Sequence, residues 1–366
     1  MTITKNILEV YYEPAISGIT RHVGQFVKRL NGENLRFHIL CSTNDPRISE
    51  YYRALGVPVY TVPAAKYFSI RGMWEAARLI KRLNINIVHI HNLQSIFWAH
   101  LPRLIYPRVS FILTPHIINF ENRALKRIFY ISWRIFSILT DKIIALSEAQ
   151  KEILIGEKIK RVNAVIVIPN SISEEEVGCA ETDEKCAPLP AGEPYILSII
   201  RLVRQKDPLR IIAIAEKVCQ QNPAVHFFIV GEGPLNAEMK MEIEKKGLGG
   251  RVFLLGYRKD IPALIRHATI ILSTSLWEGM PYSLLEAMYL EKPIVASDIE
   301  GHKGLVLDGV TGFLAGTIDD FEEKILRLLF DEQLRKSMGN MAGKHFEKYF
   351  SFEQFIGKIR SIYLGD

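Results

Sequence analysis

Residues 273–288 read STSLWEGMPYSLLEAM, and this stretch decides the fold. The apolar run that leads into it predicts a buried strand, and a loop with Glu278 and Gly279 follows. A helix is predicted to begin near Pro281–Ser283, because proline is tolerated in a first helical turn, where its missing N–H has no intrahelical partner anyway. Strand, loop and helix in this order form the repeating unit of a parallel α/β sheet.

The same alternation of short apolar runs with amphipathic stretches continues on both sides of this unit. Helical patterns include TRHVGQFVKRL (20–30), RGMWEAARLIKRL (71–83), Pro208–Gln221 and Asn236–Lys246. The strand-like runs are NILEVYY, RFHILCS, VPVYTVP, INIVHIHN, VSFILTP, KIIALS and AVIVIP in the first half, and PYILSII, AVHFFIVG, RVFLLG, TIILSTS and KPIVASD in the second. This rhythm predicts mostly parallel sheets with helices on both faces.

One stretch interrupts the rhythm and divides the chain. Residues 173–194 are acidic, contain Pro and Gly, and hold few large apolar side chains, which is typical of an inter-domain linker. We therefore expect two Rossmann-like domains facing across a cleft, at residues 1–172 and 195–345. The helical pattern at 346–366 is expected to return to the first domain. Ligands of such sheets bind at the carboxyl ends of the strands.

Charge is unevenly divided between the halves. The net charge is +6, but residues 1–170 carry 23 Lys+Arg against 11 Asp+Glu, a local charge of +12, which leaves −6 for residues 171–366. A basic first half suggests an anionic partner, with solvated surface charge as the alternative interpretation. Nucleic acid is not the partner that we expect.

The cysteines and the apolar runs also bear on the cellular compartment of the protein and on whether it binds a metal. Cys179 and Cys186 form the one close cysteine pair, and their spacing matches no common zinc motif. No disulfide framework is indicated, no signal-peptide pattern opens the sequence, and no apolar run reaches the roughly 20 residues of a membrane span. We expect a cytoplasmic protein with no metal and no clustered set of metal-ligating side chains.

Cations and carboxylates follow the predicted strands of the second half. Arg201 and Lys206 come directly after a strand, where they would neutralise a diphosphate and stabilise it as it leaves. Free N–H groups in the helix that begins near Pro281 can hold an anion, and Gly279 allows a ligand close to the backbone. Glu286 can accept two hydrogen bonds from a ribose diol, and Glu278 can accept from sugar hydroxyls. Unrelated surface side chains are the alternative interpretation.

Glycines and a histidine mark three further loops. Gly231 and Gly233 permit a tight turn from strand to helix, although a lone GxG is weak evidence of a ligand. Gly18 precedes a helix in the first half and is a second candidate for close phosphate approach. His116 follows a strand in LTPHIINF. His89 is interpreted as a packed side chain, and His91 as either packed or lining the cleft.

The order of these motifs resembles glycosyltransferase family 4, over essentially the whole chain. The resemblance is carried by Gly18, His116, IIALSE (143–148), VIPN (167–170), Arg201 with Lys206, VGEGP (230–234), EGMPYSLLEAM (278–288) and DGVTGFL (308–314). It implies the GT-B fold, a nucleotide-sugar donor such as a UDP- or GDP-sugar, retention of the anomeric configuration and no required metal.

The resemblance also implies a role for each candidate residue. Arg201 and Lys206 are assigned to the diphosphate, and Glu286 to the ribose. Glu278 is assigned to the donor sugar, and His116 to the sugar on the acceptor side. Tyr257 and Arg258 are assigned to the neighbourhood of the base. The remaining donor-binding assignments are Gly18, Gly231 and Gly233, together with Gly279, Met280, Pro281, Tyr282 and Ser283 in the loop after Glu278.

Several positions depart from the family pattern. Ile200 and Asp207 stand where glycines commonly flank the Arg–Lys pair, and Ser17 and Ser171 replace two other loop glycines. Gly304 stands where a glutamate is common. These changes concern the shape of the phosphate loops, because the charged residues of the motif are all present.

The expected function is transfer of a hexose or N-acetylhexosamine to a hydroxyl acceptor, such as a lipid-linked or cell-surface polysaccharide precursor. A sugar-nucleotide epimerase of the same fold and a non-catalytic nucleotide-sugar-binding protein remain alternatives. Residues 121–139 interleave cations with aromatic side chains, including Lys126, Arg127, Trp133 and Arg134. They are expected to lie on an anionic membrane surface, or else to pack as a helix on the sheet.

Overall fold

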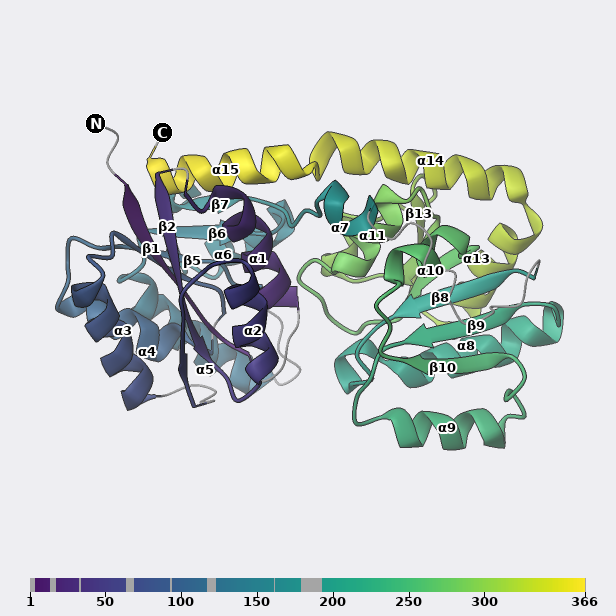
Figure 1. The fold of residues 1–366 in the computed structure, drawn as a ribbon. Helices are drawn as coiled ribbons and strands as arrows, with labels where there is room; N and C mark the ends of the chain where they lie inside the picture. Colours follow the sequence, from purple (N-terminus) through teal and green to yellow (C-terminus); the bar gives the residue numbers. More distant parts are fainter. Residues whose placement is uncertain are drawn as a thin grey trace. The chain divides into compact units, whose positions relative to one another are not determined.

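The structure is a computed structural model that describes residues 4–13, 18–32, 34–63, 69–92, 94–116, 123–160, 162–178 and 193–365. The chain divides into two compact units. Unit 1 combines Met1–Asn170 with Glu353–Asp366, and unit 2 is Ser171–Phe352. Each unit is built around one parallel sheet (Figure 1).

Unit 1 contains a seven-stranded sheet in the order β3-β2-β1-β4-β5-β6-β7, with every pair parallel. The direction of strand order reverses between β1 and β4, so the carboxyl ends of these two strands form the switch point at which such sheets bind ligands. The strands are β1 (Lys5–Tyr12), β2 (Leu35–Ser42), β3 (Val59–Val62), β4 (Ile87–Ile90), β5 (Ser110–Leu113), β6 (Lys142–Ala145) and β7 (Val165–Val167).

Unit 2 repeats this arrangement with six parallel strands, in the order β10-β9-β8-β11-β12-β13. Its switch point lies between β8 and β11. The strands are β8 (Tyr195–Ile199), β9 (His226–Val230), β10 (Val252–Gly256), β11 (Ile270–Ser273), β12 (Ile294–Ser297) and β13 (Gly312–Ala315).

Helices connect the strands in both units. In unit 1 they are α1 (Gly18–Leu30), α2 (Pro46–Ala54), α3 (Ile70–Arg82), α4 (Ile96–His100), η1 (Leu101–Leu104), α5 (Arg123–Ser137), α6 (Glu148–Gly156), η2 (Val162–Ala164) and α15 (Phe352–Leu364). In unit 2 they are α7 (Glu174–Gly178), η3 (Arg204–Lys206), α8 (Pro208–Gln221), α9 (Asn236–Lys245), α10 (Ile261–His267), α11 (Tyr282–Tyr289), α12 (Glu300–Lys303), α13 (Ile318–Phe330) and α14 (Glu332–Tyr349).

Helix termini follow from local sequence signals. Ser69 and Thr317 are N-caps whose hydroxyl oxygens accept from the backbone N–H groups of Gly72 and Asp320. At the carboxyl end of α15, Lys5 Nζ donates to the carbonyl oxygens of Tyr363 and Leu364, at 3.0 and 2.7 Å. A cation at the last carbonyls of α15 satisfies groups that have no intrahelical partner and favours the helix dipole.

The predicted α/β pattern is confirmed in both units. Each predicted strand is present, and α8 spans the predicted Pro208–Gln221. β13 is a strand that the analysis of the sequence did not predict, and its DGVTGFL stretch had been used only as a family motif. The predicted domain boundary at residue 346 lies inside α14, so the helix that returns to unit 1 begins at Phe352.

Two expectations fall partly outside the described residues. Of the predicted linker, the structure describes α7 and the approach to β8, while residues 179–192, with Cys179 and Cys186, lie outside the described part. Residues 121 and 122 of the predicted membrane segment also lie outside it.

α5 corrects the predicted membrane segment in one respect. The aromatic side chains of Tyr130 and Trp133 are 3% and 1% exposed, and they pack in the core of unit 1. They are therefore not available for contact with lipid. This differs from the expectation that Trp133 lies on a membrane surface. The helix instead exposes Ile131 and Ile135, and Ile138 follows directly after it.

Candidate functional site

The switch point of unit 2 brings the loops after β8 and β11 together. Leu276 N donates to Gln205 O at 2.8 Å, and Gln205 Nε2 donates to Trp277 O at 2.9 Å. The hydroxyl of Thr274 donates to the carbonyl oxygens of Lys206 and Asp207, each at 3.0 Å. These hydrogen bonds hold the loop that carries Arg201 and Lys206 against the loop that carries Glu278.

Lys206 and Glu278 meet at this junction. The Lys206 ammonium forms an ion pair with Oε1 of Glu278, and that oxygen also accepts from Ser275 Oγ at 2.6 Å. Both side chains are largely buried, at 15% and 7% exposed. The predicted phosphate cation and the predicted sugar carboxylate are thus neighbours. Arg201, in contrast, is exposed, and its Nη2 lies 3.5 Å from Gln205 Oε1.

A buried histidine, which the analysis of the sequence did not single out, lies behind this pair. His302 Nε2 is 3.3 Å from Ser273 Oγ, and Nδ1 is 2.9 Å from Ser297 O. Burial lowers the pKa of His302, and the nearby Glu278 carboxylate opposes that shift. The imidazole is therefore neutral at pH 7 and ties the ends of β11 and β12 together.

α11 begins at Tyr282, as predicted, with Pro281 as its N-cap. Gly279 lies in the loop before it, Met280 is 7% exposed, and Ser283 is the second residue of the helix. The Pro281 side chain makes no capping hydrogen bond, and its carbonyl oxygen accepts from Leu284 N and Leu285 N at 3.3 and 3.4 Å. Glu286 lies in the same helix and is 6% exposed.

Gly231 and Gly233 have a packing reason to be glycine. A Cβ on Gly231 would lie 1.8 Å from Ile200 O, and one on Gly233 would lie 2.4 Å from Leu202 O. Gly231 also has φ of +130°, which L side chains rarely adopt. The two glycines therefore let the loop after β9 lie directly against the loop that carries Arg201.

Tyr257 and Arg258, the predicted base-binding residues, differ in their surroundings. Tyr257 follows β10 and is 68% exposed. Arg258 donates to both carboxylate oxygens of Asp260, at 2.8 and 2.5 Å. Its guanidinium is thus already held by a neighbour two residues away.

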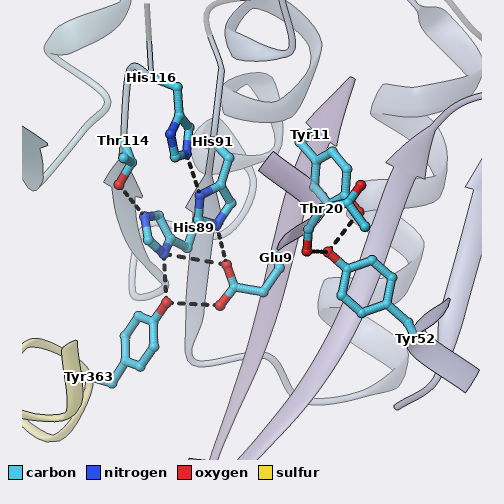
Figure 2. A network of polar contacts seen from close by, with 9 residues as sticks. All are labelled: Glu9, Tyr11, Thr20, Tyr52, His89, His91, Thr114, His116 and Tyr363. Carbon is cyan, nitrogen blue, oxygen red and sulfur yellow. Dashed lines mark hydrogen bonds and ion pairs between the residues drawn. The ribbon is translucent and has the colours of Figure 1, made fainter. Parts of the chain in front are cut away.

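Unit 1 carries a second polar site at its own switch point, which Figure 2 shows. The β1–β4 register places Glu9 beside His89, with His91 just after β4. Glu9 Oε2 accepts from His91 Nε2 at 2.6 Å, and Glu9 Oε1 accepts from the Tyr363 hydroxyl at 2.9 Å. A carboxylate in the middle of β1 is thus compensated from β4 and from α15.

When Glu9 is ionised, the hydrogen bonds assign the tautomers of two histidines. Because the Tyr363 hydroxyl gives its proton to Glu9, it accepts from His89 Nδ1, at 2.6 Å. His89 Nε2 then accepts from Thr114 Oγ1 at 2.8 Å. His91 donates through Nε2, so its Nδ1 carries a lone pair, and this atom lies 3.5 Å from His116 Nε2.

Burial governs protonation throughout this cluster. It raises the pKa of Glu9 to about 7 and lowers the pKa of His91 to about 3. It also lowers the pKa values of His22, His89 and His116 well below the usual range. The imidazoles are therefore neutral at pH 7.

The structure corrects the expectation that the chain lacks a clustered set of metal-ligating side chains. His22, His91 and His116 form one such set, and Glu9, His89 and His91 form another. His91 thus belongs to the polar site, and His89, which was interpreted as packed, is buried with both ring nitrogens bonded. Among the cluster residues that the analysis of the sequence did not discuss, Glu9 carried a usable signal, since an acid inside an apolar strand needs a partner.

Gly18 is the first residue of α1. In the first turn of this helix, both the backbone N–H and the hydroxyl of Thr20 donate to Glu13 Oε2. A carboxylate therefore already binds the first turn of this helix, and the phosphate role of Gly18 stays a prediction.

Two family models together match most of the chain. The model described as Glycosyltransferase Family 4 matches residues 16–176, and the model described as Glycosyl transferases group 1 matches residues 180–345. No helix in the described part of the chain combines the length and the apolar character of a membrane span.

Curated relatives and solved structures agree with these matches. The chain is 27% identical to the Escherichia coli UDP-Gal:alpha-D-GlcNAc-diphosphoundecaprenol alpha-1,3-galactosyltransferase, over 98% of this chain and 96% of the relative. It is 34% identical to a Campylobacter jejuni alpha-1,4-N-acetyl-D-galactosaminyltransferase that acts on a diNAcBac-PP-undecaprenol-linked glycan, over 46% and 49% of the two chains. Its fold matches Anabaena HepE in complex with UDP and glucose, with a TM-score of 0.80, 19% identity, and coverage of 98% and 99%.

Proposed function

Since the chain belongs to glycosyltransferase family 4 and is a GT-B glycosyltransferase, we propose that it transfers a hexose or N-acetylhexosamine from a nucleoside diphosphate sugar to a hydroxyl acceptor, with retention of the anomeric configuration. The observation that carries the donor assignment is the Lys206–Glu278 pair at the β8/β11 switch point. A cation and a carboxylate side by side match a diphosphate joined to a polyhydroxylated sugar.

The proposed division of roles follows from charge and burial. Lys206 and Arg201 bind the diphosphate and stabilise its growing charge as it leaves, which is a form of electrostatic catalysis. Glu278 accepts from donor-sugar hydroxyls, as does the loop from Gly279 to Ser283. Glu286 accepts from the ribose, and His116 acts on the acceptor side.

Retention is proposed to proceed by front-face substitution. The bond between the anomeric carbon and the diphosphate oxygen breaks, and the acceptor oxygen bonds to the same face of that carbon. The leaving phosphate oxygen takes the proton of the acceptor hydroxyl, so no protein nucleophile is required. Stereochemistry of the product glycoside, read by NMR coupling constants, tests this step.

We propose that donor binding in unit 2 needs no metal. Among the described residues, both clusters capable of holding a metal lie in unit 1. Calorimetric affinity for the donor is therefore expected to be the same with and without EDTA. A donor that binds only with magnesium or manganese would contradict this assignment.

A lipid-linked diphosphate sugar is the proposed acceptor. The Escherichia coli and Campylobacter jejuni relatives are both named for undecaprenol-linked diphosphate substrates. The charge of +12 on residues 1–170 suits an acceptor of this kind at an anionic membrane surface. α5 and the residue after it add exposed apolar side chains at Ile131, Ile135 and Ile138, beside the exposed Arg127 and Arg134.

The function is tested by a screen of UDP- and GDP-sugars with undecaprenyl diphosphate sugars and with soluble glycans as acceptors. Transfer to the lipid, detected by mass spectrometry, is the expected result. An isomerised sugar nucleotide formed without acceptor would indicate an epimerase, and donor binding without any turnover would indicate a binding protein.

Membrane docking has its own test. Replacing Ile131, Ile135 and Ile138 by serine is expected to reduce sedimentation with anionic liposomes at low salt. Met241→Ser, which removes a similarly exposed apolar side chain of α9 in unit 2, is the matched control. Equal sedimentation of both variants would contradict docking through α5.

A further inference from the structure

The polar site of unit 1 holds three histidines whose ring nitrogens lie close to one another. His22 comes from α1, His91 from the end of β4 and His116 from the end of β5. One nitrogen from each ring lies within 4.8 Å of the corresponding nitrogens of the other two. We propose that these three side chains bind one divalent transition-metal ion, with zinc as the best fit, an activity beyond the proposed sugar transfer.

The spacing of the nitrogens fits a metal better than a hydrogen bond. His116 Nε2 and His91 Nδ1 are 3.5 Å apart, whereas N–H donors in proteins usually lie about 2.7–3.2 Å from their acceptors. Two nitrogens bound to a tetrahedral zinc ion at about 2.0–2.1 Å lie about 3.3 Å from each other. The observed distance is therefore close to one edge of such a tetrahedron.

The arrangement of the rings agrees with this geometry. Ring centroids are 4.7 Å apart for His22 and His116, 5.6 Å for His22 and His91, and 5.7 Å for His91 and His116. Imidazoles around one tetrahedral zinc ion have centroids about 5 Å apart. All three pairs thus lie near the centroid spacing that a shared ion requires.

Glu9 supplies the outer support that metal-binding histidines usually have. Its carboxylate accepts from His91 Nε2 at 2.6 Å, which leaves the Nδ1 lone pair facing His116 (Figure 2). A carboxylate behind a histidine ligand fixes the tautomer and raises the basicity of the ligand. The negative charge of Glu9 also offsets part of the charge of a buried ion.

The other candidate set, Glu9 with His89 and His91, is a weaker site. Both ring nitrogens of His89 already have partners, Tyr363 at 2.6 Å and Thr114 at 2.8 Å. The oxygens of Glu9 likewise accept from Tyr363 and His91. A metal there would have to break several of these hydrogen bonds, whereas the three-histidine centre keeps the bond from His91 to Glu9 and replaces the 3.5 Å contact between His91 and His116.

The ligand chemistry selects the class of ion. Neutral imidazoles suit zinc, copper, nickel and iron, while magnesium and calcium prefer oxygen ligands. Three protein ligands leave a fourth tetrahedral position for water or a substrate oxygen. With the ion bound, Nε2 of His116 is a ligand, so the acceptor-side role proposed for that ring applies to the metal-free protein.

The test uses the full chain, loaded with ZnCl₂ and dialysed before elemental analysis. The wild type is expected to retain one equivalent of zinc, and MgCl₂ is expected to have no effect on thermal stability. His22→Gln and His116→Gln should lose the ion, and Glu9→Gln should weaken zinc affinity about 10–100-fold. His100→Gln is the matched control, since it removes another buried histidine of unit 1 that lies outside the cluster.

Zinc retention by His22→Gln and His116→Gln equal to that of His100→Gln would overturn the proposal. X-ray absorption of the zinc-loaded wild type decides the matter even if the variants fail to fold. Three imidazole nitrogens at about 2.0–2.1 Å are expected, and a sulfur ligand or a failure to bind zinc would overturn the site. None of these measurements involves a sugar donor, so they stand apart from the test of glycosyl transfer.

Discussion

Lys206 and Glu278 form a largely buried ion pair although 72 residues separate them in the chain. The pair exists because β8 and β11 are neighbours in the sheet and their following loops meet. In the absence of a donor, each charge is compensated by the other. In the proposed function, a diphosphate entering the site would compete with Glu278 for the ammonium, so donor binding would be coupled to the freeing of the carboxylate for a sugar hydroxyl.

Removing either donor cation should slow the reaction. Arg201→Gln and Lys206→Gln are each expected to lower kcat/KM by about 2–4 kcal/mol of transition-state stabilisation, or roughly 30- to 1000-fold. The double variant should lose less than the sum, because both groups act on the same phosphates. Steady-state kinetics measure this. Lys217→Gln, on the surface of α8, is the control, and wild-type rates in either single variant would refute the assignment.

Glu286→Gln tests the proposed ribose contact while it keeps the size of a side chain that is 6% exposed. Hydrogen bonds to a charged acceptor contribute about 1.5–3 kcal/mol, so donor affinity is expected to fall roughly 10- to 100-fold. Calorimetric titration with the nucleotide sugar and with the free nucleoside diphosphate measures this loss. The exposed Glu300→Gln serves as control, and an unchanged affinity for both ligands would remove Glu286 from the donor site.

Gly231→Ala should destabilise unit 2. The added Cβ would lie 1.8 Å from Ile200 O, in a backbone conformation with φ of +130°. Strain of this kind costs about 1–3 kcal/mol before the clash is counted. Gly249→Ala is the matched control, because a Cβ there meets nothing within 4 Å. Thermal unfolding compares the two, and equal Tm values would show that the loop after β9 adapts freely.

Acid should destabilise unit 1 through His100. Its Nε2 lies 2.7 Å from Thr140 Oγ1 and its Nδ1 donates to Ile96 O, and burial lowers its pKa to about 4. The unfolded imidazole binds a proton below about 6.5 and the folded one only below about 4, so stability falls as the pH drops through this window. The loss reaches about 3 kcal/mol for this group.

Denaturant unfolding between pH 7 and pH 4 measures the effect. His100→Gln should unfold with about one proton less taken up in this range than the wild type. His267→Gln, which removes an exposed histidine of unit 2, should keep the wild-type dependence. A His100→Gln variant with that same dependence would show that His100 does not contribute.

The fold was predictable because its signals are local. Alternation of apolar runs with amphipathic stretches predicted parallel strands and helices that the structure confirms, and the motif around Glu278 and Glu286 pointed to the family that the comparisons show. The GxG of Gly231 and Gly233 predicted a turn, but the packing of that turn on the Arg201 loop depends on the neighbouring strand and has no local signature.

The unit 1 site could not be predicted in this way. Glu9, His22, His89 and Tyr363 come from four elements, and only strand order and register bring them together. In the sequence, the position of His22 does not distinguish it from any other residue of a helix. Tyr363 likewise fits the pattern of an aromatic side chain that packs from an amphipathic helix. The buried acid in β1 was the one clue, because it required partners without indicating which.

The contact of Tyr363 with Glu9 also determines an order of events during synthesis on the ribosome. Residues 1–170 leave the ribosome first, yet Glu9 lacks one of its hydrogen-bond donors until residue 363 has been made. The whole of Ser171–Phe352 is translated in between. Unit 1 therefore reaches its final packing only after all of unit 2 has been translated.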